Sequence, residues 1–275
     1  MPYDCLRISR KDDVVVVALS RPQQRNALNA TAWRELGCFF RRCIGPDCRA
    51  VVLVGDGPVF CAGIDLKDPT FGSALAGNTD PARAGLAFQS QLAEMQDAFT
   101  ALEACPVPVI AAVHGPCLGA GVDLVSAADI RLASSEATFS VREVVLGLAA
   151  DVGTLQRLPK IVGNESWVRE VCLTGRVFDA DEALRVGLVS RVSPRVVDDA
   201  LRLAHTISQH SPVAVVGTKR ALLYARDHSV GDGLAQISQY SALALQSPDF
   251  KILQGRKAKG STKPEYANLH PQARL

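Results

Sequence analysis

Three short apolar runs constrain the fold of this chain most strongly. They cover residues 14–20, 50–55 and 106–113, and Val, Ala, Leu and Ile make up most of each. Runs of this length are typical of strands buried on both faces of a sheet. Amphipathic patterns typical of helices separate them at residues 31–44 and 88–104. The alternation predicts an α/β fold with a parallel sheet.

The remaining chain divides into two parts. Residues 5–10 read as a further strand, 67–85 as a long loop, 119–127 as a helix, and 130–133 and 138–140 as short strands. Beyond residue 151 nearly every segment has a helical pattern, and only residues 188–192 read as a strand. No internal repeat is visible. The helical last third is expected to pack on the core or on another subunit.

Composition excludes several classes of protein. Of 275 residues, 48% are hydrophobic and 21% charged, which is typical of a globular chain with a sizeable core. A net charge of +2 gives no reason to expect nucleic acid or a membrane surface as partner. No apolar run is long enough for a membrane span, and the first residues resemble no leader peptide. The eight cysteines lack metal-ligand spacing, so we expect reduced thiols and no metal site.

Two glycine-rich loops follow two of the predicted strands. Residues 61–66 read Cys-Ala-Gly-Ile-Asp-Leu, and residues 118–124 read Leu-Gly-Ala-Gly-Val-Asp-Leu. Small residues allow a ligand to approach the backbone, and a helix N-terminus offers free N–H groups. Together the loops could hold one carbonyl oxygen in an oxyanion hole. Each loop taken alone also fits an ordinary turn from strand to helix.

Three acids lie in apolar stretches near the second loop: Asp123, Glu143 and Asp151. A carboxyl group buried in apolar surroundings has a raised pKa, so it can both accept and donate protons near neutrality. Each acid also has a structural interpretation. Asp123 could favour a helix dipole, Glu143 could form a surface salt bridge, and Asp151 could cap the helix that follows. Spacing alone leaves both interpretations open.

Several motifs in order resemble the crotonase (enoyl-CoA hydratase/isomerase) superfamily from about residue 14 to residue 258. They are RPQQRNALN, FCAGIDL, PVPVIAAVHGPCLGAGVDLVSAADIRLAS, FSVREVVLGLAADVGTLQRLPKIVG, TGRVFDADEALRVGLVSRV and PVAVVGTKRAL. The acid set resembles most the Δ3,5-Δ2,4-dienoyl-CoA isomerases of that superfamily. Their Asp, Glu and Asp match Asp123, Glu143 and Asp151, whereas hydratases carry Glu at the first place and no acid at the third.

The resemblance implies a spiral of ββα repeats with a C-terminal helical trimerisation region. It places the spiral core at residues 1–195, the helical oligomerisation region at 196–258 and a polar tail at 259–275. A homotrimer or a dimer of trimers is expected. The oxyanion donors fall on the N–H groups of Ile64 and Ala120. The residues expected at the substrate thioester are Cys61, Ala62, Gly63, Ile64, Asp65 and Ala120. Many members have Gly where this chain has Ala120, which leaves less room for the thioester.

The expected function is isomerisation of a 3,5-dienoyl-CoA to a 2,4-dienoyl-CoA in fatty-acid β-oxidation. Glu143 is the candidate base at C2 and Asp151 the candidate acid at C6, with the reverse assignment open; Asp123 would tune the pair. No cofactor beyond the substrate's own coenzyme A is expected. The alternatives are a 2-enoyl-CoA hydratase, or a non-catalytic protein that binds acyl-CoA or RNA.

Two further expectations concern the phosphates of the substrate's CoA group and the C-terminus of the chain. Arg25, Lys251 and Lys257 are candidates for the CoA phosphates. The C-terminal Ala273-Arg274-Leu275 resembles a peroxisomal address and predicts an import receptor as partner, with the cytoplasm or mitochondrion as alternatives.

Overall fold

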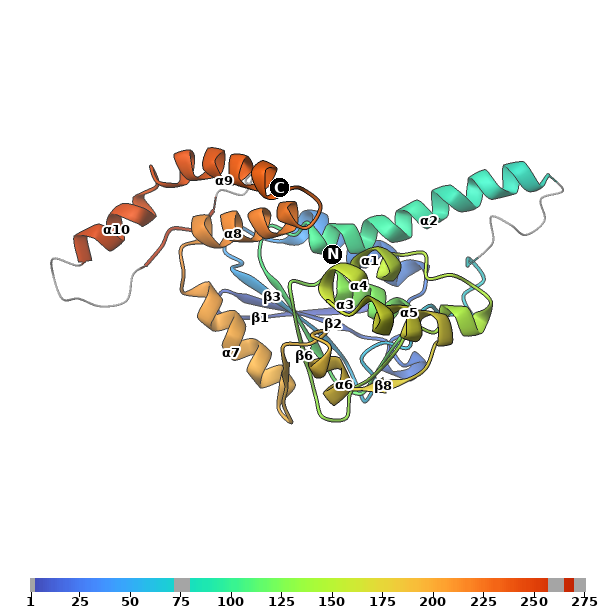
Figure 1. Ribbon diagram of the computed structural model, residues 1–275. Helices are drawn as coiled ribbons and strands as arrows, with labels where there is room; N and C mark the ends of the chain where they lie inside the picture. Colours follow the sequence, from blue (N-terminus) through green and yellow to red (C-terminus); the bar gives the residue numbers. More distant parts are fainter. Residues whose placement is uncertain (1–2, 72–79, 257–264, 270–275) are drawn as a thin grey trace.

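The chain folds around two β-sheets in a computed structural model that describes residues 3–71, 80–256 and 265–269. Helices cover both faces of the larger sheet, while α2 and the C-terminal helices extend beyond it (Figure 1). The order of the larger sheet is β1 (Leu6–Lys11), β2 (Val14–Leu19), β3 (Ala50–Gly55), β4 (Val109–Val113), β6 (Ile130–Ala133) and β9 (Arg191–Val192). The smaller sheet holds β5 (Pro116–Leu118), β7 (Thr138–Ser140) and β8 (Phe178–Asp179).

The larger sheet is parallel except at its first strand. β1 pairs antiparallel with β2, and each later neighbour pairs parallel, as in the register of Val14 with Ala50. Every residue of β3 and of β4 is buried. This burial on both faces explains why these strands read as continuous apolar runs, and it confirms the predicted parallel sheet.

From β4 to β7 successive strands alternate between the two sheets, as the predicted spiral requires. β4 lies in the larger sheet and β5 in the smaller; after α3 (Ala120–Ser126), β6 returns to the larger sheet and β7 to the smaller. β4, β5 and α3 thus form one ββα unit, and β6 and β7 begin the next. The strands of the smaller sheet are two or three residues long, too short to carry an apolar period. The repeat is therefore invisible in the sequence, and β5 and β8 were missed.

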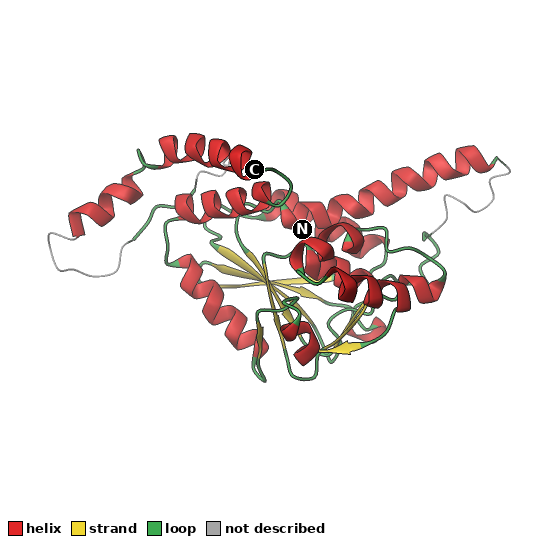
Figure 2. Cartoon of the chain, viewed as in Figure 1, coloured by secondary structure: helices red, strands yellow, loops and turns green. Residues whose placement is uncertain are grey.

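The described helices include one long segment and several short ones (Figure 2). The α-helices besides α3 are α1 (Ala30–Cys38), α2 (Pro81–Glu103), α4 (Thr154–Ile161), α5 (Glu165–Thr174), α6 (Ala180–Arg185), α7 (Val196–Ser208), α8 (Pro212–Ala225), α9 (Val230–Ala244) and α10 (Pro248–Arg256). The 3-10 segments are η1 (Pro22–Gln24) and η3 (Glu143–Leu146), and the π-helical segment η2 (Phe39–Cys43) extends α1.

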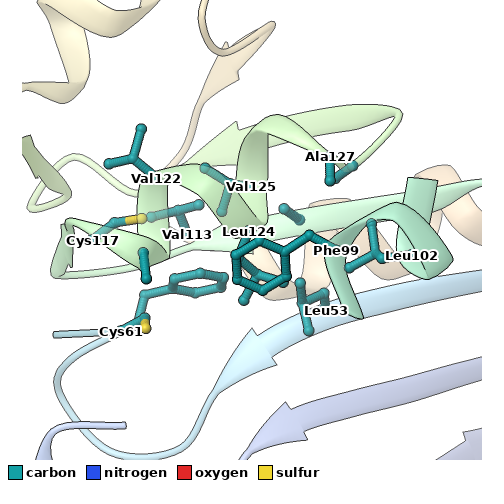
Figure 3. Close-up of a cluster of buried hydrophobic side chains, with 14 of the residues drawn as sticks. Leu53, Cys61, Phe99, Leu102, Val113, Cys117, Val122, Leu124, Val125 and Ala127 are labelled. Atoms are coloured by element: carbon teal, nitrogen blue, oxygen red, sulfur yellow. The ribbon is translucent and has the colours of Figure 1, made fainter. Parts of the chain in front are cut away.

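The two faces of the larger sheet bury separate apolar clusters. On one face, residues of β2, β3 and β4 pack with α1, α2 and α3, and Leu53, Phe99 and Leu124 lie at the centre (Figure 3). On the other face, Val52 and Ile110 pack against Ala200 of α7. α7 therefore packs on the core, although residues 196–258 were assigned to the oligomerisation region.

Two predicted boundaries near the first glycine-rich loop are wrong. α2 begins at Pro81, inside the segment predicted as a loop, because the Asp80 side chain accepts hydrogen bonds from the N–H groups of Ala82 and Arg83. The loop at residues 61–66 leads into turns rather than into a helix. Its backbone instead forms a parallel bridge between Ile64 and Leu28.

Part of the predicted polar tail packs on the core. The buried Arg49 guanidinium donates to the Tyr266 carbonyl at 2.6 Å and to Asn268 Oδ1 at 2.9 Å. The proposed address at Ala273–Leu275 lies outside the described residues. Within the described ranges, the helices are too short or too polar to cross a bilayer.

Candidate active site

The two glycine-rich loops lie side by side at the carboxyl ends of β3 and β4. Cys61 and Cys117 form a parallel bridge. The Cys61 N–H donates to the Pro116 carbonyl at 3.2 Å, and the Leu118 N–H donates to the Cys61 carbonyl at 2.9 Å. These bonds hold the loops in a fixed register, as the hypothesis of one shared binding site requires.

The contact between the loops depends on glycine at position 63. Gly63 has a φ of 92°, and a Cβ atom there would lie 2.9 Å from the Leu118 carbonyl oxygen and 3.5 Å from Ala120 N. The peptide nitrogen of Ala120 therefore lies beside Gly63, the residue that precedes Ile64. Neither the Ile64 N–H nor the Ala120 N–H donates a hydrogen bond to another described residue. The geometry therefore offers the two free donors of an oxyanion hole.

A cavity of about 230 Å³ opens beside these donors. Most of its wall is apolar, and six predicted site residues line it: Ala62, Gly63, Ile64, Ala120, Glu143 and Asp151. Trp33, Phe88, Leu92 and Met95 close it from α1 and α2. These four were missed as site residues because an apolar helix face looks the same whether it covers a core or a ligand.

Cys61 and Asp65 do not line this cavity, contrary to expectation. The Cys61 side chain is fully buried behind the loop, where Sγ contacts the Asn26 carbonyl at 3.3 Å and accepts the Gly63 N–H at 3.5 Å. Asp65 forms an ion pair with Arg21 at 2.9 Å. Cys61 therefore shapes the loop from behind, whereas Asp65 lines an adjoining cavity.

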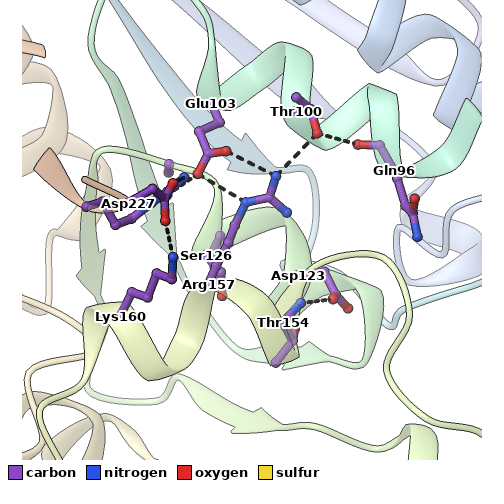
Figure 4. A network of polar contacts seen from close by, with 12 residues as sticks. Gln96, Thr100, Glu103, Asp123, Ser126, Thr154, Arg157, Lys160 and Asp227 are labelled. Carbon is purple, nitrogen blue, oxygen red and sulfur yellow. Dashed lines mark hydrogen bonds and ion pairs between the residues drawn. The ribbon is translucent and has the colours of Figure 1, made fainter. Parts of the chain in front are cut away.

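Asp123 is fully buried and binds the start of α4. Its Oδ1 accepts the Thr154 N–H at 2.5 Å (Figure 4), whereas Oδ2 has no hydrogen-bond partner among the described residues. The helix cap that local rules assigned to Asp151 is thus supplied by Asp123. Burial raises the pKa of Asp123, and the charge of Asp151 raises it further, against the lowering effect of Thr154.

Glu143 begins η3 and lies beside the second loop. A Cβ atom on Gly119 would lie 3.2 Å from Glu143 Oε1, and Oε2 is buried without a hydrogen-bond partner among the described residues. No ion pair involves Glu143 in the described ranges, so the surface salt bridge is not observed. Burial, followed by the charge of Asp123, raises the pKa of Glu143. Such a carboxyl group can act as a base near neutrality.

Asp151 lies in the turn that precedes α4. The residue is exposed as a whole, but the burial of its carboxyl group is enough to raise its pKa. It lines the apolar cavity and also a polar groove between α2 and α4. Glu143 and Asp151 therefore line one cavity from separate segments of the chain.

A larger cavity of about 510 Å³ adjoins the first and shares Trp33, Ile64, Phe71 and Met95 with it. Of the residues proposed for the CoA phosphates, Arg25 and Lys251 line neither cavity, and Lys257 lies outside the described residues. Among the described side chains, no group of three His, Cys, Asp or Glu is placed to hold a metal ion.

Comparison with known proteins assigns the chain to a family. Residues 9–263 match the Enoyl-CoA hydratase/isomerase family over most of the chain. The chain belongs to this family. The resemblance inferred from the motifs is confirmed, and so is the crotonase fold.

Individual family members agree with the assignment. The chain is 49% identical over 252 residues to the mitochondrial Delta(3,5)-Delta(2,4)-dienoyl-CoA isomerase of Homo sapiens, covering 90% of this chain and 77% of that protein. It is 38% identical over 280 residues to the peroxisomal Delta(3,5)-Delta(2,4)-dienoyl-CoA isomerase of Arabidopsis thaliana, covering 97% and 98%. An enoyl-CoA hydratase structure from Bacillus anthracis superposes with a TM-score of 0.85 at 27% identity, covering 96% and 99%.

Replacing Gly63 with Ala should impair this enoyl-CoA hydratase/isomerase site by separating its two loops. The added methyl group meets the Leu118 carbonyl, and the positive φ disfavours any L side chain. We expect kcat to fall about 10²-fold, as after loss of one oxyanion donor. Steady-state kinetics measures the effect, with Gly85→Ala on α2 as control, since a Cβ atom there meets no other atom. Unchanged kcat in Gly63→Ala would argue against the oxyanion hole.

The raised pKa of Glu143 predicts a pH dependence of stability. Folding shifts this pKa from 4.5 to about 7, so the folded protein binds the proton more tightly than the unfolded chain does. Stability should therefore fall as pH rises through this window and level off above it. Glu143→Gln has no carboxylate to ionise in this buried place. The free energy of unfolding of this variant minus that of wild type should therefore grow by about 1–2 kcal/mol between pH 5 and pH 8, a range that allows for the partial exposure of Glu143. Urea denaturation at both pH values tests this; a constant difference contradicts it.

Proposed function

We propose that this protein isomerises 3,5-dienoyl-CoA to 2,4-dienoyl-CoA in fatty-acid β-oxidation. One observation carries the proposal: Glu143 and Asp151 line the same apolar cavity, next to the free N–H groups of Ile64 and Ala120. Relatives whose names state this activity support it, at up to 49% identity over most of the chain.

The two free N–H groups would bind the thioester oxygen of the substrate. Removal of a proton from C2 places negative charge on that oxygen and gives a dienolate. Preorganised donors stabilise such a charge more than they stabilise the neutral carbonyl group. The surrounding apolar wall, which includes Leu92 and Met95, excludes water and strengthens both hydrogen bonds.

Two carboxyl groups would move the protons at separate carbons. Glu143 takes the proton from C2, and the protonated Asp151 gives a proton to C6 as the carbonyl group re-forms. Solvent then takes the proton from Glu143 and returns one to Asp151, which restores the starting states. The double bonds move from C3 and C5 to C2 and C4, with no change in oxidation state. Asp123 keeps the pKa of Glu143 high through its charge and holds the start of α4. No cofactor is required, since every step is a proton transfer on an activated thioester.

The alternative within the family is hydration of a 2-enoyl-CoA, with Glu143 and Asp123 positioning water. Asp151 favours isomerisation because hydration needs no third acid in the cavity. Both activities can be assayed on one preparation, with 3,5-octadienoyl-CoA and a 2-enoyl-CoA as substrates. We expect a conjugated 2,4-dienoyl product to form far faster than a 3-hydroxyacyl product. Hydration alone, or acyl-CoA binding without turnover of either substrate, would contradict the proposal.

We also propose a homo-oligomer, a trimer or a dimer of trimers, held by the C-terminal helices. α9 buries none of its residues, and Val230, Leu234 and Leu243 are 64–81% exposed. Large apolar side chains left this exposed on one helix favour an interface. The double variant Leu234→Glu/Leu243→Glu should be monomeric in light scattering, while the exposed Gln239→Glu should keep the wild-type mass. A monomeric wild-type protein would contradict this assignment.

We also propose that the C-terminal residues Ala273–Leu275 direct import into peroxisomes. The plant relative is named peroxisomal and the human relative mitochondrial, so the family occurs in both organelles. A substitution of Leu275 that abolishes import in cells would support the address.

A further inference from the structure

The side of Asp151 that faces away from the apolar cavity rests on a polar face of α2. Gln96, Thr100 and Glu103 are spaced four and three residues apart, so their side chains emerge on one side of that helix. They line a groove of about 410 Å³ together with Asp151 and Arg157. Figure 4 shows this row of side chains above the start of α4. The proposed reaction assigns no role to this groove.

One hydrogen bond joins this face directly to the proposed acid. Gln96 Nε2 donates to the backbone carbonyl of Asp151 at 2.7 Å. The Asp151 carboxylate itself makes no hydrogen bond to another described residue. The direction of the carboxylate therefore depends on how its backbone is held, and Gln96 holds it.

The next residues of the turn are held by an ion pair. Arg157 Nε and Nη2 donate to the two oxygens of Glu103, both at 3.1 Å, and Nη2 also reaches Thr100 Oγ1 at 3.4 Å. The guanidinium lies against Gly153, where a Cβ atom would clash with Nη1. Arg226, the C-cap residue of α8, also pairs with Glu103, so the ion pair is fixed from both sides. The turn from Asp151 to Gly153 is thus clamped onto α2.

We propose that Gln96 is a positioning residue for Asp151 and thereby determines how well this site protonates C6. The inference rests on the proposed function, in which Asp151 is the acid at C6. Gln96 lines the polar groove and not the apolar cavity, so it would not touch a substrate bound in that cavity. Loss of its hydrogen bond should misplace the Asp151 carboxylate while leaving Glu143 and the oxyanion donors in place. Small displacements of a catalytic group can lower a rate by 10- to 100-fold.

Gln96→Met tests this, because methionine keeps the length of the side chain and removes the donor. We expect kcat for 3,5-octadienoyl-CoA to fall at least tenfold, with KM within twofold of wild type. Exchange of the C2 proton with D2O should persist, since Glu143 performs it. The matched control is Gln89→Met, at an exposed position of the same helix, which should retain full activity. In an Asp151→Asn background, Gln96→Met should have no further effect.

The outcomes separate this inference from the proposed function. If the wild-type protein does not isomerise the substrate, the proposed function fails and this inference with it. If the wild-type protein isomerises it and Gln96→Met does so within twofold, only the positioning role is overturned. An equal loss of C2 exchange and isomerisation would also overturn it, because that pattern indicates general damage to the site.

Discussion

Replacing Asp151 with Asn is expected to lower the rate of isomerisation by about 10³-fold, within the range found for general acids. Asparagine has nearly the same shape but has no acidic proton to give to C6. The dienolate should still form, because Glu143 and the two N–H donors are unchanged. Affinity for the acyl-CoA should also remain, since Asp151 touches only the reacting end of the substrate in this mechanism.

Two measurements on Asp151→Asn separate the steps. Isomerisation is followed by the conjugated product, and C2 exchange by incorporation of deuterium from D2O into recovered substrate. We expect the first to be nearly lost and the second to continue. Isomerisation at the wild-type rate would refute the assignment of Asp151 as the acid. Asp181→Asn, on α6 and away from the cavities described above, should behave like wild type.

Replacing Glu143 with Gln should abolish both steps, by about 10³-fold or more, because no base then removes the C2 proton. The same variant should be more stable than wild type at neutral pH, since it removes a charge that is half-buried beside Asp123. Together, a loss of activity and a gain of stability distinguish a catalytic role from a structural one.

The decisive measurement is exchange of the C2 proton with D2O. We expect Asp151→Asn to retain this exchange and Glu143→Gln to lose it. Chemical denaturation of the same preparations gives the stability difference. If Glu143→Gln retained exchange while Asp151→Asn lost it, the two carboxylates would have the reverse assignment, which the chemistry of the return reaction also allows. Exchange in both variants would show that neither is the sole base.

The central strands could be predicted because they are buried on both faces. β3 and β4 read as apolar runs, and their parallel pairing followed from the helices between them. The smaller sheet could not be predicted, since β8 has only two residues and pairing between distant segments defines it. The spiral was expected from family resemblance and not from local pattern.

Part of the candidate site could likewise be predicted from the sequence, and part could not. Glycine-rich loops and isolated acids are local signals, and the structure places Gly63, Ala120, Glu143 and Asp151 around one cavity. The acid that caps α4 is determined by tertiary structure, because the Thr154 N–H donates to Asp123, a residue 31 positions earlier in the chain. Local capping rules favour the nearer Asp151 and are wrong here.

The contribution of α2 to the site had no sequence signal. Gln96 is one of several polar residues on a helix, and its contact with Asp151 spans 55 positions. The start of α2 was also misplaced, because the Asp80 cap and Pro81 are embedded in a segment rich in glycine and alanine. The contact of Gln96 depends on which element packs beside the helix, whereas the Asp80 cap is a local signal that the surrounding composition obscures.

The central claim is that separate carboxyl groups serve C2 and C6. It is tested most directly by the position of deuterium in the 2,4-dienoyl-CoA formed by the wild-type protein in D2O. Asp151 is exposed toward the polar groove and should exchange its proton with solvent between turnovers. We therefore expect one deuterium at C6 in nearly every product molecule. Transfer of the substrate's own C2 proton to C6, with no deuterium there, would contradict the account.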